Sequence, residues 1–125
     1  MQPTMWMVRA GSGALRIQEF IDQNLVALGW TEIGDLSLLK SREAILERVR
    51  ALWPEYKFRK ATGTAGNLFR FAHEFRAGDN VISYDASGRC YHVGEIVGPY
   101  AFEPTKVENL PHTRPVRWIS TITRD

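Results

Sequence analysis

The order of its segments constrains this chain most, because β-favouring stretches lie at both ends and amphipathic helices lie between them. Residues 5–10 (MWMVRA) and residues 116–122 (VRWISTI) each have the apolar, β-favouring character of a strand. No internal repeat or low-complexity tract interrupts the order. The order predicts one compact α+β domain in which a small curved sheet carries flanking helices.

The other elements follow from local patterns of caps, breakers and apolar spacing. Ser12 is expected to cap the first helix and Ser41 the second, which Pro54 ends, and Gly63-Thr64 is expected to open the third. The expected elements are a helix over 14–23, a strand over 25–30, a loop over 31–39, a helix from 42 to 53, a helix from 63 to 76, strands over 81–84 and 90–97 around the hairpin turn 85–88, and a loop over 102–115.

Length and composition narrow the class of protein. The 125 residues suffice for one domain with a sizeable core, and we expect a single domain over residues 1–125, standing alone or as a piece of a longer protein. No apolar run approaches the roughly 20 residues that cross a membrane, so no membrane partner is expected. Cys90 is the only cysteine, which excludes an internal disulfide and a thiolate cluster for zinc and is typical of a cytoplasmic protein.

The positive charge is concentrated in one stretch. The whole chain has a formal net charge of +2, whereas residues 57–76 hold five basic side chains against Glu74 alone, a net of +4. Such a patch can bind a polyanion through phosphate contacts, or it can be an ordinary solvated face. The four residues that we expect to contact phosphates are Lys57, Arg59, Lys60 and Arg70.

Motifs for catalysis are sparse. The chain has no nucleophile elbow, no phosphate-cradling loop and no dinucleotide fingerprint. Its three histidines form no close-spaced pair of ligands, so neither a metal nor a cofactor is expected. Glu55-Tyr56-Lys57 matches the Glu-x-Lys of metal-dependent nucleases, but it directly follows a proline that ends a helix. We therefore expect a domain that is not an enzyme and keep the nuclease as an alternative.

Several segments together carry a resemblance to a known family. They are 6–11 (WMVRAG), 27–30 (ALGW), 78–85 (GDNVISYD), 91–100 (YHVGEIVGPY) and 114–118 (RPVRW). In this order the chain resembles the N-terminal domain of Mrr-type restriction system proteins, a PUA-like domain related to the EVE and YTH modules. The resemblance implies a small curved β-barrel with flanking helices. It also implies a domain that reads a modified, typically methylated, base in DNA and directs a fused or associated endonuclease domain.

A flipped base needs aromatic faces, since stacking returns part of the cost of leaving the duplex. Trp30 lies at the end of the expected second strand and precedes a polar loop, and by the resemblance the matching strand end in YTH-like modules carries a cage tryptophan. Trp6 is a candidate second wall, and Tyr84 a candidate third. For Trp30 a place in the core is the alternative, and for Trp6 and Tyr84 a place in the core or an ordinary strand is favoured over the cage.

Polar groups would check the edge of the base and bind its phosphate. Arg9 stands before the glycine-rich turn 11–13, where a phosphate would be favoured, or it pairs with a carboxylate such as that of Asp35. Ser12 is a helix cap or a hydrogen-bond donor. Asp35 is a turn residue or an acceptor for an exocyclic amine, and Asn67 offers a donor and an acceptor at the third helix.

The function expected from these residues is a DNA-binding module that flips a modified base into an aromatic pocket. Beside the nuclease, two alternatives stay open: an RNA-binding PUA-like domain, and an interaction domain with no nucleic-acid ligand. The 2′-hydroxyl would separate RNA from DNA, and a salt-dependent affinity would separate both from the interaction domain.

Overall fold

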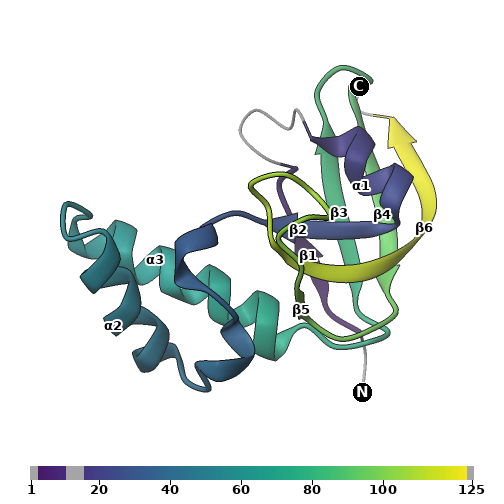
Figure 1. The fold of residues 1–125 in the computed structure, drawn as a ribbon. Helices are drawn as coiled ribbons and strands as arrows, with labels where there is room; N and C mark the ends of the chain where they lie inside the picture. The colour runs from purple at the N-terminus through teal and green to yellow at the C-terminus, as the bar shows by residue number, and fades with distance from the viewer. Residues whose placement is uncertain (1–2, 11–15, 124–125) are drawn as a thin grey trace.

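The computed structural model describes residues 3–10 and 16–123. Within them, six strands form one sheet in the order β1-β3-β4-β6-β2, with β5 added beside β6 (Figure 1). Strand β1 runs parallel to β3, and every other pairing is antiparallel. The strands are β1 (Met5–Met7), β2 (Leu25–Leu28), β3 (Asn80–Asp85), β4 (Cys90–Ile96), β5 (Ala101–Phe102) and β6 (His112–Thr123).

The long strand β6 curls the sheet into half a barrel. Its first residues pair with β2 and β5, and its remaining residues pair with β4, so β6 passes from one part of the sheet to the other. The register of β4 against β6 shifts between Val93 and Gly94. A Cβ at Gly94 would lie 2.5 Å from a methyl group of Val116 and 2.9 Å from the ring of Trp118, so only glycine fits where β6 crosses.

The helices divide into two groups. Helix α1 (Ile17–Gln23) covers the sheet, whereas α2 (Arg42–Leu52) and α3 (Phe58–Phe69) pack together to one side of it (Figure 1). Helix α3 continues into one π-helical turn, η4 (Arg70–Glu74). The short 3-10 turns η2 (Thr31–Ile33) and η3 (Leu36–Leu38) run from β2 to the helical pair.

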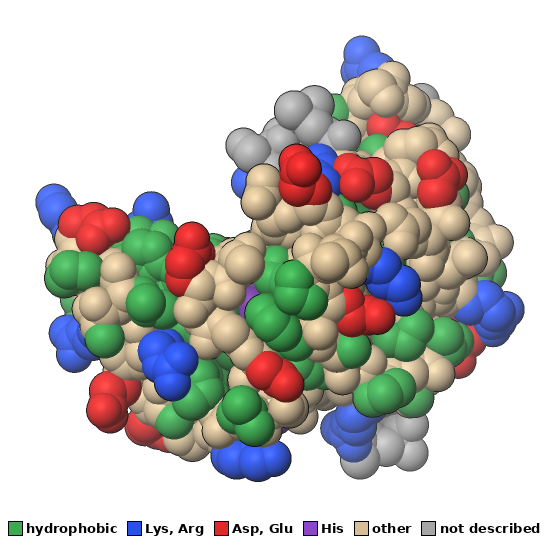
Figure 2. All heavy atoms as spheres, viewed as in Figure 1, with side chains coloured by type: hydrophobic (Ala, Val, Ile, Leu, Met, Phe, Trp, Pro, Cys, Tyr) green, Lys and Arg blue, Asp and Glu red, His purple; other side chains and the backbone are tan. Residues whose placement is uncertain are grey.

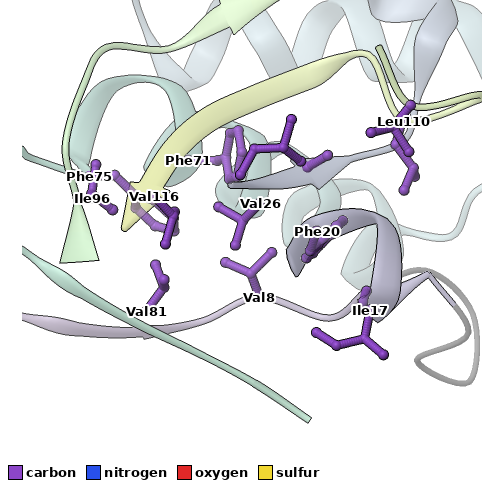
Figure 3. Close-up of a cluster of buried hydrophobic side chains, with 14 residues drawn as sticks. Val8, Ile17, Phe20, Val26, Phe71, Phe75, Val81, Ile96, Leu110 and Val116 are labelled. Carbon is purple, nitrogen blue, oxygen red and sulfur yellow. The ribbon is translucent and has the colours of Figure 1, made fainter. Parts of the chain in front are cut away.

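Each group encloses its own core. Val8, Phe20, Val26 and Val81 point toward one another inside the curled sheet (Figure 3). A second cluster lies between α2, α3 and the 3-10 turns, and it includes Ile33, Leu36, Ile45, Val49 and Leu68. The sheet and the helical pair therefore have separate cores and meet at a boundary between them.

Several expected elements are confirmed. Ser41 Oγ accepts a hydrogen bond from the Ala44 amide at 3.1 Å and so caps α2, which ends before Pro54. The hairpin β3–β4 is confirmed, with its turn at residues 86–89, one residue later than the predicted 85–88. The result is a mixed α/β fold with a curled half-barrel sheet, in agreement with the predicted α+β class.

Several predicted boundaries were wrong. The third helix begins at Phe58 and not at Gly63, because Arg59, Lys60 and the buried Ala61 favour a helix before the glycine. The interval 102–115 is not wholly a loop, since β5 ends in it and β6 begins at His112. Strands β1 and β2 are also shorter than expected, and the predicted cap Ser12 lies outside the described residues.

No helix in the described part of the chain combines the length and the apolar character that a bilayer crossing requires.

Candidate functional site

A cleft of about 960 Å³ lies between the strands β1 and β2 and the helix α3. The space-filling view shows a notch in the outline between the helical pair and the sheet (Figure 2). This volume is at the upper end of the range for small-molecule sites. The lining residues are Trp6, Met7, Val8, Arg9, Ala27, Leu28, Gly29, Trp30, Lys60, Asn67, Arg70, Phe71, Phe75 and Leu110.

Trp6 forms part of the wall from β1, and its ring is held from two sides. Its indole Nε1 donates to Asp79 Oδ2 at 2.9 Å, and its ring stacks on Phe75 with the ring centroids 4.7 Å apart. Asp79 also accepts from the amides of Thr4 and Arg76. Burial opposes ionisation of Asp79, but these hydrogen bonds and the charge of Arg76 outweigh it and hold the pKa of Asp79 below its usual value.

Trp30 forms part of the wall at the end of β2, and its backbone is strained. It has φ of +59° and ψ of +55°, a left-handed conformation that a bulky side chain rarely adopts. Its ring is half-buried and packs against the helical core. Strain of this kind persists only where the surroundings enforce it, and it is enriched at ligand sites.

A chain of hydrogen bonds fixes the backbone of Trp30. The Trp30 carbonyl lies 3.2 Å from His112 Nε2, so this nitrogen must be the donor. In the neutral ring Nδ1 is then an acceptor, and the Tyr100 hydroxyl, at 2.7 Å, donates to it. The Tyr100 oxygen in turn accepts from the Leu36 amide at 3.0 Å. The chain therefore ties Trp30 to β6, to the segment before β5 and to η3.

Burial sets the protonation of this chain. It raises the pKa of Tyr100 to about 12, and the negative charge of Asp35 acts in the same direction. Burial also lowers the pKa of His112, against the opposing effects of the Trp30 carbonyl and of Asp35. Both side chains are therefore neutral near pH 7, as the hydrogen-bond directions require.

Helix α3 supplies the polar wall. Lys60, Asn67 and Arg70 follow one another at helical spacing, and Arg70 Nη2 donates to Asn67 Oδ1 at 2.7 Å. Within residues 3–10 and 16–123, Asn67 Nδ2 has no protein acceptor, so both its hydrogens are available to a ligand. The π-helical turn that begins at Arg70 contains Phe71, which also lines the cleft. Such turns occur often at functional sites.

The cations of the cleft are not neutralised by carboxylates. Across the described ranges, no ion pair involves Arg9, Lys60 or Arg70. Lys60 Nζ lies 4.3 Å from the centroid of the Tyr56 ring, and Arg9 is exposed at the end of β1. The alternative of an ion pair between Arg9 and Asp35 is therefore not found among the described residues, and the cleft keeps a net positive rim.

The remaining predicted residues lie elsewhere. Asp35 does not line the cleft, and its carboxylate caps η3 by accepting from the Ser37 amide at 2.9 Å. The ring of Tyr84 packs on Tyr91 in the β3–β4 hairpin, away from the lining residues. Lys57 and Arg59 are exposed at the start of α3 but outside the cleft.

Two further residues were singled out from the sequence. Ser12 lies outside the described residues. Glu55, of the nuclease-like tripeptide, is exposed between α2 and α3, and it belongs to no group of three potential metal ligands in the ranges that the structure describes.

Sequence reasoning missed several residues that shape the site. Phe71, Phe75 and Leu110 line it, whereas Tyr100 and His112 support it from behind. The helical spacing of Phe71 and Phe75 indicates only that both side chains are buried, and it does not indicate that they line a cleft. His112 followed a proline and was interpreted as part of a loop, so its burial was not foreseen.

The comparisons with known proteins give one finding. A family model described as a domain of unknown function (DUF8426) matches residues 6–125. No curated protein and no solved structure matches the chain.

Proposed function

The chain belongs to the DUF8426 family, whose description names no activity, and we propose from the cleft that it is a DNA-binding module that reads a modified base. The base would be flipped out of the duplex and held between aromatic side chains of a PUA-like domain. The module would direct a fused or associated endonuclease domain to modified DNA. One observation carries the proposal: two tryptophans, one open amide and three cations that form no ion pair with the described residues line a single cleft.

The aromatic side chains account for the affinity. A flipped base loses stacking and pairing worth a few kcal/mol, and each aromatic contact returns about 1–3 kcal/mol. Trp6 lies on β1 and Trp30 lies just before η2, and Phe75 packs behind the Trp6 ring. A methyl group on the base would add apolar contact with Leu28 and Leu110, which also line the cleft.

The polar residues account for selection and anchoring. Asn67 presents two hydrogens, because its oxygen is taken by Arg70, and these suit the ring nitrogens or the carbonyl oxygen of a base edge. Arg9, Lys60 and Arg70 would contact the phosphates that flank a flipped nucleotide. A ligand with an aromatic ring and an anionic backbone therefore matches both the aromatic side chains and the cations that line the cleft.

The test is direct binding to matched duplexes. They are unmodified or carry N6-methyladenine, 5-methylcytosine or 5-hydroxymethylcytosine, and fluorescence anisotropy is read at two salt concentrations. Trp30→Ala and Asn67→Ala remove groups of the cleft. Trp53→Ala is the matched control, because Trp53 is also half-buried but stacks on Tyr56 outside the cleft.

We expect one modified duplex to bind at least about tenfold more tightly than its unmodified match, an advantage worth about 1.4 kcal/mol. Trp30→Ala and Asn67→Ala abolish that preference, whereas Trp53→Ala keeps it. Equal, salt-sensitive binding to all duplexes leaves only a basic patch. Tighter binding to matched RNA strands assigns the cleft to RNA, and no binding at either salt assigns the domain to protein or small-molecule partners.

A further inference from the structure

Three side chains of different chemistry converge at the turn of the β3–β4 hairpin, away from the cleft. They are Asp85, Cys90 and His92. His92 Nε2 lies 3.1 Å from Asp85 Oδ2 and 3.8 Å from Cys90 Sγ, and one ligand atom of each residue lies within 4.8 Å of the others. None of the three lines the cleft, so this cluster is independent of the proposed function.

The hairpin register produces the cluster. Asp85 pairs with Cys90 across the two strands, which places both side chains on one face of the sheet. His92 follows Cys90 by two residues and therefore shares that face. The register of this hairpin therefore brings the carboxylate of Asp85, the thiol of Cys90 and the imidazole of His92 to one face of the sheet.

Neighbouring groups orient the ligand atoms. Asp85 Oδ1 accepts from Ser87 Oγ and from the Gly88 amide, each at 3.0 Å, which leaves Oδ2 directed at the cluster. His92 Nδ1 lies 3.4 Å from Thr121 Oγ1 on β6. This is the arrangement in metal sites, where the second nitrogen of a ligating imidazole contacts a supporting oxygen.

The arrangement is not that of a catalytic triad. A Cys-His-Asp relay needs the thiol on one ring nitrogen and the carboxylate on the other. Here the thiol and the carboxylate both face Nε2, while Nδ1 faces Thr121. Three potential ligand atoms face one another, and this arrangement favours binding of a cation over proton transfer along a catalytic relay.

We propose that Asp85 Oδ2, Cys90 Sγ and His92 Nε2 bind one Zn²⁺ ion. Thiolate, imidazole and carboxylate are all zinc ligands, and bonds of about 2.0–2.3 Å in a tetrahedron place the ligand atoms roughly 3.2–3.6 Å apart. The two distances to Nε2 lie within a few tenths of an ångström of that range. Asp85 and His92 keep side-chain exposures of 17% and 19%, so water can occupy the fourth position.

Gly88 keeps the site open. A Cβ at this position would lie 3.1 Å from Asp85 Oδ2 and 3.2 Å from Cys90 Sγ, against the two ligand atoms themselves. Gly88→Ala therefore tests the site without removing a ligand. Its backbone does not need the left-handed region, so the added methyl group acts through space alone.

The experiment titrates the metal-free full chain with Co²⁺ and then with Zn²⁺. Cys90 is the only cysteine, so a thiolate-to-cobalt charge-transfer band in the near ultraviolet can come from no other residue. We expect that band at one equivalent, intense visible bands of tetrahedral cobalt, and their loss when zinc displaces cobalt. Saturating Zn²⁺ should raise the Tm by roughly 5–10 °C at about a hundredfold excess over Kd.

Variants assign the ligands. Cys90→Ser removes the charge-transfer band, and His92→Gln, Asp85→Asn and Gly88→Ala each weaken Zn²⁺ binding by at least about tenfold. Glu47→Gln, an exposed carboxylate on α2, is the control and keeps the wild-type affinity. If a ligand variant does not fold, the cobalt–thiolate band and the zinc-induced rise in Tm of the wild-type chain supply the same answer, since Cys90 is the only cysteine. Absence of a cobalt–thiolate band and of a zinc-induced rise in Tm at saturating metal would overturn the proposal.

Discussion

At the residue scale, the left-handed backbone of Trp30 reverses the usual order of two substitutions. Trp30→Ala and Trp30→Gly both remove the ring, but only glycine adopts φ of +59° without steric cost. We expect Trp30→Gly to be more stable than Trp30→Ala by about 1 kcal/mol, measured by urea unfolding. Equal stabilities, or alanine above glycine as at ordinary positions, would mean that this residue is not held left-handed in solution.

Asp79 is the second residue whose contacts give a sharp expectation, because one carboxylate accepts from the indole of Trp6 and from two backbone amides. An asparagine side chain in its place would have only one accepting oxygen. We expect Asp79→Asn to cost about 1.5–3 kcal/mol at pH 7, the range for hydrogen bonds to a charged group.

The same substitution has a pH signature. Since folding lowers the pKa of Asp79, its stabilisation is complete above the unfolded value near 3.8 and is lost as the pH falls through the folded pKa. The difference between wild type and Asp79→Asn should therefore shrink between pH 5 and pH 2. Urea midpoints across that interval measure it, and a constant difference would show that the charge of Asp79 does not contribute.

At the element scale, two glycine-to-alanine substitutions should act in opposite directions. In α3 nothing lies within 4 Å of a Cβ at Gly63, so Gly63→Ala gains helix propensity and should stabilise by about 0.5–1 kcal/mol. In β4 a Cβ at Gly94 meets Val116 and Trp118, so Gly94→Ala should destabilise by about 1–3 kcal/mol or more. Thermal unfolding of both variants checks the pair, and a Tm that moves the same way in both contradicts it.

The same elements explain which boundaries could be predicted from the sequence. The cap at Ser41 and the β3–β4 hairpin depend on local chemistry, and both were predicted, although the turn lies at 86–89 and not at 85–88. The start of α3 was not, because Gly63 is a local signal for a helix end and the buried face around Ala61 outweighs it. The expected last strand began only at residue 116, because Pro115 lacks an N–H. In the structure Pro115 belongs to β6 and pairs with Leu25, at the point where β6 passes from β2 to β4.

The site shows the same limit. Trp6, Trp30 and Asn67 were singled out one by one, but only the packing of α3 against β1 and β2 brings them to one cleft. Asp35 and Tyr84 were suited to the role by residue type and lie outside that cleft. The hairpin cluster depends on the register that pairs residue 85 with residue 90 and aligns residue 92, and the sequence analysis missed it because it placed Asp85 in the turn.

At the scale of the whole molecule, His112 links the sheet to the helical pair and makes that link sensitive to pH. It is fully buried, and it connects β6 to the start of η2 and, through Tyr100, to η3. Folding lowers its pKa, so its stabilisation is complete above the unfolded value near 6.5 and is lost as the pH falls through the folded pKa. A proton on Nδ1 would also displace the hydrogen that Tyr100 donates there.

We therefore expect the wild-type chain to lose stability between pH 7 and pH 5, at up to about 1.4 kcal/mol per pH unit. His112→Gln cannot titrate, so it should start from a lower stability and follow a flatter profile. Urea unfolding at intervals of half a pH unit compares the two. Parallel profiles would show that the acid sensitivity originates at other groups.

Because the net charge of the whole molecule is small, the salt dependence of the proposed DNA binding is set by local cations. A net charge of +2 gives little long-range attraction, so duplex binding should depend on the three cations of the cleft: Arg9, Lys60 and Arg70. Three phosphate contacts give a slope of log K against log salt of about −2.7. Lys60→Ala should reduce its magnitude by about 1, whereas Arg59→Ala, exposed on the same helix but outside the cleft, should leave it unchanged. A slope much steeper than this, reduced equally by both variants, would place the DNA over the whole start of α3 instead of in the cleft, because only such a surface would bring Arg59 to a phosphate.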